Sequence, residues 1–406
     1  MNISTGLKPA TFLLLMVLVA LNLRPALASL APLFGRLETE LAMGSLALGL
    51  LTTIPVLALG IFAPLAPILS RRLGMERTIS LALLLLVGAL LLRVWPSQLL
   101  LFLGTLLAGA SIGIAGTLLP VLVKREIAGR ADLATGLYTM ALCLGGAISA
   151  GLSVPLANLF HSWEISIGSW AIFALLVLVI WRMQIPHPWP SQTTKHSQSK
   201  LPGLMENPLA WHITLLMACQ SSLAYTTFGW LPNLLQQRGI AEAEAGFMLS
   251  ATVLVQTGAA LIAPWLARLG RDQRPALVFL LLLTAAGVVM ALMGNDAMVW
   301  PGMVLLGIGQ GGNFSLALAL IVLRSSTPAV ATQLSGMVQG IGYFLAAIGP
   351  FVVGLLLDMQ LGLAWVTGTI VGIIFMAAIM ATLAGRRLQL LPDPTSGRII
   401  THPQRH

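Results

Sequence analysis

Charged side chains are scarce in this chain. Only 9% of its 406 residues are Asp, Glu, Lys or Arg, whereas 57% are hydrophobic and the mean hydropathy is +0.91. Soluble domains carry about 25% charged residues. This deficit excludes an ordinary soluble domain. It predicts an all-α membrane protein that crosses the bilayer many times, with its backbone polar groups satisfied inside helices.

Cysteine is almost absent too. Cys143 and Cys219 both lie in apolar segments, so we expect buried, inert thiols. Two cysteines make no metal site, and the chain contains neither a CxxC nor an HExxH pattern. No nucleophile–base pair can be recognised either. These absences argue against an enzyme, a metal centre or a bound cofactor.

Long apolar runs are what the chain has instead. Each of twelve runs is long enough to cross a hydrocarbon core of about 30 Å. They cover 11–34, 45–69, 78–95, 99–123, 134–158, 165–184, 209–235, 243–268, 275–293, 297–323, 330–357 and 364–384. The first run is too long for a signal peptide and lacks a convincing cleavage site, so we interpret it as the first helix.

The longest polar gap separates the sixth and seventh runs. It is rich in Pro, Ser, Gln and Lys and cannot bury a core. We therefore predict an N-terminal six-helix bundle (1–184), a cytoplasmic linker (185–208), and a C-terminal six-helix bundle with a tail (209–406).

Basic residues alternate between loops. The loops after the second, fourth, sixth, eighth and tenth runs are rich in Lys and Arg, whereas the opposite loops hold only Arg36, Arg93 and Arg238. The positive-inside rule then places both termini in the cytoplasm. It also accounts for the net charge of +9 without a nucleic-acid partner.

The two halves repeat at an offset of 200 residues. Ala63-Pro64 corresponds to Ala263-Pro264, and Thr52 to Thr252. Transporters built from such repeats bind substrate near the midplane.

One charge is expected deep in an apolar run. Arg24 lies about halfway along 11–34, and we expect no other ionisable side chain at that depth. An arginine there costs about 2.5–3.5 kcal/mol on insertion scales. Because the acidic residues lie almost entirely in loops or at span ends, we hypothesise that the substrate supplies the counter-anion. Alternatively, the guanidinium only bonds polar groups between helices.

Helical spacing places Arg24, Ala28, Ala31 and Gly35 on one face of small residues. Pro25 cannot donate a backbone hydrogen bond, which predicts a bend beside the cation. The counterpart of Arg24 in the second half is Ala224, so the pocket should be asymmetric.

Other polar residues inside the runs are candidates for neutral substrate contacts. Each has an alternative as a hydrogen-bonding residue between helices. They are Tyr138, Tyr225, Gln256, Gln310, Asn313, Gln339 and Tyr343.

At this point the chain resembles the major facilitator superfamily over nearly its whole length. Within it, the chain is similar to the bacterial cyanate and nitroimidazole transporter family. The segments that carry this likeness are Leu23-Arg24-Pro25, Ala31-Pro32-Leu33, Arg71–Glu76, Gly109–Ile114, Lys124-Arg125, Tyr225, Gly229–Pro232, Gly307–Gly312, Gln339–Tyr343 and Gly349-Pro350.

The resemblance also implies gating loops. The segment Ser70–Arg77 lacks the aspartate usual at this place, with Glu76 as a partial substitute. The gating residues we expect are Arg71, Arg72, Glu76, Arg77, Arg268 and Arg271.

The function predicted is secondary transport of a small anion, such as cyanate or a small carboxylate, across the bacterial inner membrane by alternating access. Arg24 is the central anion-binding residue. The alternative is an exporter of neutral or heteroaromatic toxic compounds. We expect a monomer that needs no partner besides lipid and a small-molecule substrate.

Overall fold

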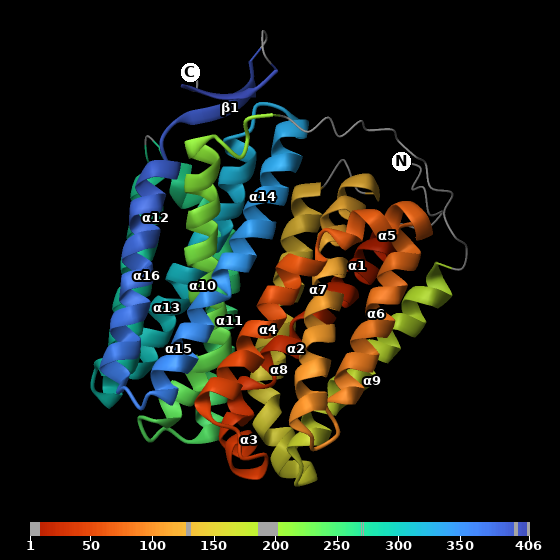
Figure 1. The fold of residues 1–406 in the computed structure, drawn as a ribbon, viewed down its shortest axis with the longest axis vertical. Helices are drawn as coiled ribbons and strands as arrows, with labels where there is room; N and C mark the ends of the chain where they lie inside the picture. The colour runs from red at the N-terminus through yellow and green to blue at the C-terminus, as the bar shows by residue number, and fades with distance from the viewer. Residues whose placement is uncertain are drawn as a thin grey trace. The chain divides into compact units, whose positions relative to one another are not determined.

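The computed structural model describes residues 9–126, 131–185, 202–268, 270, 272–393 and 397–403, and these are predominantly helical (Figure 1). Packing divides them into two compact units. The first unit comprises the described residues within Met1–Thr194 together with Thr227–Leu254. The second comprises those within Lys195–Thr226 and Val255–His406.

The helices of the first unit follow the first six predicted runs. They are α1 (Pro9–Leu23), α2 (Pro25–Ala28), the 3-10 helix η1 (Ala31–Leu33), α3 (Phe34–Glu40), α4 (Ser45–Phe62), α5 (Leu65–Leu73), α6 (Met75–Leu92), α7 (Gln98–Glu126), α8 (Ala131–Phe160) and α9 (Trp163–Gln184).

Two long helices run from one unit into the other. They are α10 (Pro208–Gln236) and α11 (Glu242–Arg268). The C-terminal part of α10 from Thr227 and the N-terminal part of α11 up to Leu254 pack with the first unit.

The second unit continues with helices and ends in two strands. Its further elements are α12 (Arg274–Met293), α13 (Asp296–Leu323), α14 (Pro328–Ala346), α15 (Ile348–Asp358), α16 (Leu363–Ala384), β1 (Leu388–Pro392) and β2 (Ile399–Pro403). All twelve predicted runs are therefore helical in the described residues. Among the described residues, eleven helical segments are long and apolar enough to cross a membrane, where helices joined across a bend count as one. The helix α10, of 29 residues, is more polar and is not among them.

Prolines break the first run, as Pro25 predicted, but they break it more strongly than expected. Arg24 forms a turn between α1 and α2, and Ala31-Pro32 forms a 3-10 turn before α3. These breaks interrupt the regular hydrogen bonding of the helix. The predicted single face of Arg24, Ala28, Ala31 and Gly35 stays a prediction.

The helix surfaces divide as expected for a protein in lipid. On α9, Trp163 and Trp181 are fully buried, whereas Ile172 is 65% exposed. In an apolar solvent an exposed isoleucine carries no penalty, so such faces suit contact with acyl chains.

The C-terminal residues form an antiparallel hairpin rather than an irregular tail (Figure 1). The backbone of Leu390 bonds to Arg324 and Ser326 at the end of α13, and the Ile399 N–H donates to the Pro202 carbonyl at 2.9 Å. The hairpin thus ties together the ends of two helices of the second unit. Apolar periodicity did not predict it because the strands are short and half-exposed.

Candidate functional site

Arg24 lies where the first transmembrane segment breaks. It is the N-cap of α2, and its carbonyl accepts the N–H groups of Leu27 and Ala28 at 2.9 and 3.1 Å. Its guanidinium carbon lies 5.2 Å from the centre of the Phe228 ring, which belongs to the same unit. A cation–π contact of this kind contributes about 0.5–2 kcal/mol.

The charge of Arg24 is not balanced within the described part of the chain. No hydrogen bond or ion pair joins its side chain to another described residue, and its side chain is half-buried. An aromatic ring orients a guanidinium without neutralising it, because the ring carries no formal charge. The planar set of N–H donors therefore stays open to an external acceptor.

Gly146 on α8 makes room for this pair. A Cβ built there would lie 3.5 Å from Arg24 Cβ and 3.7 Å from Phe228 Cε1. Any larger side chain at this position would extend from that Cβ towards the cation and the ring. Asn22, two residues before Arg24, bonds a neighbouring helix, since its Nδ2 donates to the Phe173 carbonyl of α9 at 3.4 Å.

The second unit holds neutral polar residues in pairs. Tyr225 and Tyr343 meet edge to face, with ring centres 6.1 Å apart. Gln339 Nε2 donates to Ser335 Oγ at 2.8 Å, one turn apart on α14. The candidate Gln339 thus bonds a side chain of its own helix.

Two buried glutamines bond each other between helices. Gln256 Nε2 on α11 donates to Gln310 Oε1 on α13 at 2.9 Å, and Gln310 Nε2 donates to the Leu223 carbonyl at 3.3 Å. Asn313 Nδ2 donates to the Gly309 carbonyl at 3.0 Å, while its buried Oδ1 has no hydrogen-bond partner among the described residues. This geometry matches the interhelical alternative for the two glutamines and leaves one acceptor of Asn313 open.

The remaining predicted residues are scattered. Tyr138 is half-buried on α8, Arg72 and Arg77 are exposed, and Glu76 is buried at the start of α6. The side chains of Arg71 and Arg268, and the whole of Arg271, lie outside the described residues. The gating role expected for this group stays a prediction.

The expectation that Arg24 is the only ionisable side chain deep in the bilayer stays a prediction, but two further arginines are buried within the protein. Arg93, in the turn after α6, is fully buried, and Arg324 is 99% buried. Arg324 donates to the Ala384 and Gly385 carbonyls, both at 3.1 Å, and to Gln273 Oε1 at 2.5 Å. Burial lowers the pKa of Arg324 to about 10, which still leaves it protonated at neutral pH.

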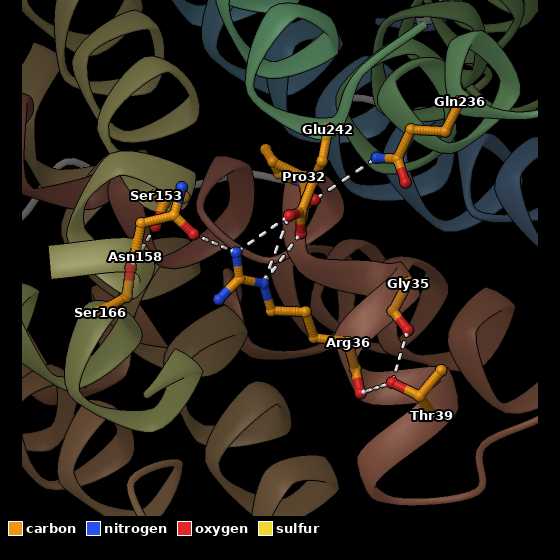
Figure 2. Close-up of polar contacts among 9 residues, drawn as sticks. All are labelled: Pro32, Gly35, Arg36, Thr39, Ser153, Asn158, Ser166, Gln236 and Glu242. Carbon is orange, nitrogen blue, oxygen red and sulfur yellow. Dashed lines mark hydrogen bonds and ion pairs between the residues drawn. The ribbon is translucent and has the colours of Figure 1, made fainter. Parts of the chain in front are cut away.

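A polar cluster joins three helices of the first unit (Figure 2). Arg36 on α3 donates through Nη2 to Glu242 Oε2 at 3.0 Å and to Asn158 Oδ1 at 2.5 Å, and through Nε to Glu242 Oε1 at 3.2 Å. Each charged side chain is about a quarter exposed. Figure 2 also shows Gln236 directed at the Pro32 carbonyl, 3.5 Å away. We call Arg36, Asn158 and Glu242 the α3–α11 clamp.

Comparison with known proteins defines the class. The model of the Major Facilitator Superfamily matches residues 12–350, and the chain belongs to this superfamily of membrane transporters. The xylose transporter XylE of Escherichia coli, solved in an inward-open conformation, superposes with a TM-score of 0.75 at 14% identity. That alignment covers 92% of this chain and 95% of XylE.

Relatives identified by sequence show which transporters within this superfamily the chain is similar to. The chain is 37% identical to an uncharacterized transporter, YycB, of Bacillus subtilis over 84% of this chain and 85% of the relative. It is 34% identical to the 2-nitroimidazole transporter of E. coli (88% and 92% covered), and 31% identical to its cyanate transport protein CynX (85% and 89% covered). The chain is thus a multi-pass transporter of the bacterial plasma membrane with a small-molecule substrate, and it is not an enzyme.

Three features escaped the sequence reasoning. Phe228 is one apolar residue among many, although it follows Tyr225 by one helical turn. Arg93 was assigned to a loop because it follows the apolar run of α6. The partners Arg36 and Glu242 are 206 residues apart, and no local pattern connects them.

Proposed function

We propose that this transporter moves a small anion by alternating access and that Arg24 is its central anion-binding residue. The observation that supports the proposal most is the unbalanced charge of Arg24 at the break between α1 and α2. A cation inside a membrane is costly, and such residues generally serve a substrate or ion path. A substrate anion offsets that cost only while it is bound.

The flat guanidinium suits a planar or bidentate acceptor such as a carboxylate, and its charge also attracts a small linear anion such as cyanate. The name of the cyanate transport protein, a relative at 31% identity, agrees with this substrate class. The neutral residues Tyr225, Gln339 and Tyr343 supply hydrogen-bonding groups for the same substrate in this proposal. The binding roles of these three remain predictions.

The α3–α11 clamp supplies a contact that alternating access has to break. Loop charges predict that this end of the helices faces the periplasm. Glu242 begins a helix that continues into the second unit, whereas Arg36 and Asn158 belong wholly to the first. We infer that the clamp stabilises the conformation closed on this side.

A second function is export of a neutral heteroaromatic compound. The relative named as a 2-nitroimidazole transporter favours it, being 34% identical over 88% of this chain. An aromatic substrate would stack on tyrosine or phenylalanine rings and would depend little on the charge of Arg24.

Uptake in proteoliposomes separates the two. Radiolabelled cyanate, benzoate and 2-nitroimidazole are presented to wild type, Arg24→Gln and Arg24→Lys, with Arg182→Gln as a control that removes one exposed cation. We expect saturable uptake of an anion that falls about 100-fold in Arg24→Gln, because a buried charge contact is worth about 2–5 kcal/mol. Uptake of 2-nitroimidazole alone, unchanged in Arg24→Gln, would establish the second function instead.

A further inference from the structure

A second arginine reaches the same break in the first transmembrane segment. Arg93 follows α6 directly, and its side chain is completely buried. Its Nη1 donates to the Ala26 carbonyl at 2.7 Å, across 67 residues of sequence. Ala26 is only two residues from Arg24 and lies within α2.

The neighbouring helix α7 leaves space for the Arg93 side chain. The Arg93 side chain passes close to Gly104 of α7. A Cβ at that position would lie 2.8 Å from Arg93 Cγ and 2.6 Å from the Ala89 carbonyl oxygen. Real Cβ atoms do not approach backbone oxygen so closely. Any other residue at this position would displace α6 or push the Arg93 side chain aside.

The Ala26 carbonyl needs this donor. The four-residue helix α2 closes its last turn with the Ser29 N–H on the Pro25 carbonyl, after which the chain turns into η1. No backbone N–H of the described residues donates a hydrogen bond to the Ala26 carbonyl. An unbonded carbonyl is costly inside a membrane, and Arg93 satisfies it.

Stability alone explains Arg93 poorly. Its Nε and Nη2 are buried without a hydrogen-bond partner among the described residues. Burying a charge with two unused donors costs free energy, which one hydrogen bond to a carbonyl offsets only in part. The arginine therefore serves something other than the packing of α6 and α7.

We propose that Arg93 is a positioning residue for Arg24. By holding the Ala26 carbonyl it fixes α2, whose N-cap is Arg24, and so fixes the direction from which the guanidinium meets Phe228 and the substrate. This inference rests on the proposed anion-binding role of Arg24 and adds a residue of α6 to that site.

The test compares Arg93→Met and Arg93→Lys in the uptake assay, with the anion that the wild type transports. Losing one hydrogen bond from a charged donor should raise the half-saturation concentration about tenfold in Arg93→Met. We expect the maximal rate per folded transporter to stay within about twofold, as docking but not the transport cycle is changed. The thermal midpoint should stay the same or rise, and Arg93→Lys, which keeps one donor, should recover most of the affinity.

Two further variants sharpen the result. Gly104→Ala displaces the same side chain and should reproduce the higher half-saturation concentration of Arg93→Met. In an Arg24→Lys background, Arg93→Met should add less than about a twofold change, since both residues act through one contact.

An unchanged half-saturation concentration in Arg93→Met would overturn the positioning role. So would an effect of full size in the Arg24→Lys background, or a loss of affinity that only accompanies unfolding. If Arg24→Gln abolishes uptake while Arg93→Met behaves as wild type, the anion site stands and this inference fails. If Arg24→Gln itself transports normally, the proposed function fails first.

Discussion

Arg24 in the first unit and Arg324 in the second are both arginines with little or moderate exposure, yet their surroundings differ. Arg324 donates to two main-chain carbonyls and one glutamine, all in its own unit. The side chain of Arg24 faces one aromatic ring and makes no hydrogen bond or ion pair with a described residue. A buried charge whose donors are all used stabilises the fold, whereas a charge left open is available to a ligand.

This contrast also separates the two units. In the second unit the polar residues that were predicted to line the site find partners within the unit: Gln256 bonds Gln310, Gln339 bonds Ser335, and the Tyr225 and Tyr343 rings meet. In the first unit the cation is left without a counter-charge. The asymmetry deduced from Ala224 standing opposite Arg24 in the repeat is thus accompanied by a difference in hydrogen bonding.

Moving the cation from position 24 to position 224 should have the largest effect on transport. We expect the double variant Arg24→Ala/Ala224→Arg to transport the anion at about 1% of the wild-type rate, no better than Arg24→Ala alone. A loss of about 100-fold corresponds to about 2.7 kcal/mol, within the range for an unpaired buried charge contact. Position 224 lies within α10, whereas Arg24 lies at the break between α1 and α2. Initial uptake rates, normalised to folded protein, give the answer, and recovery in the double variant would refute the asymmetry.

Removing the other cation should affect stability instead. Arg324→Gln should lower the free energy of unfolding by about 2 kcal/mol, because three hydrogen bonds from a charged donor are lost or weakened. Transport per folded molecule should stay near wild type. Thermal unfolding in detergent measures the first quantity and uptake the second. Arg24→Gln is the matched comparison, since it should show the reverse pattern.

The α3–α11 clamp should have a smaller effect on conformation. Glu242→Gln should favour opening at this end by about 1 kcal/mol, or about fivefold, because the ion pair is partly exposed and screened. A cysteine at Ser250, which contacts Gly151 in the same unit, reports this opening through its labelling rate with an impermeant maleimide. Cys143 and Cys219 are first replaced by serine.

Exchanging the two charges provides the control for the clamp. Arg36→Glu/Glu242→Arg should return the labelling rate close to wild type, whereas either single change should not. Equal labelling in wild type and Glu242→Gln would show that the pair contributes nothing to closure.

The smallest effect is expected from the neutral residues. Gln339→Ala should raise the half-saturation concentration for the anion about threefold, since one neutral hydrogen bond contributes about 0.5–1.5 kcal/mol and the Gln339 amide already donates to Ser335. Gln256→Ala should instead lower stability, because it leaves Gln310 without its buried partner. Uptake titrations and thermal unfolding of both variants distinguish a substrate contact from an interhelical bond.

The transmembrane helices and the superfamily could be predicted because apolar run length and Lys/Arg placement are local properties. The bend at Pro25 followed from the same kind of information, and the hypothesis that Arg24 binds the substrate rests on it too. The pairing of Gln256 with Gln310 and of Arg36 with Glu242 could not be predicted, since these contacts depend on how distant helices pack. The burial of Arg93 could not be predicted, because a position at the end of an apolar run does not reveal that its side chain turns back into the bundle.

The most direct test of the account is ligand binding to purified protein. Thermal unfolding is recorded for wild type, Arg24→Lys and Arg24→Gln with increasing cyanate, benzoate or 2-nitroimidazole, because a ligand that binds the folded state stabilises it by mass action. We predict that an anion raises the midpoint of the wild type, does so less in Arg24→Lys, and has no effect in Arg24→Gln, whose unliganded midpoint matches the wild type. An equal rise in wild type and Arg24→Gln would contradict the central role of Arg24.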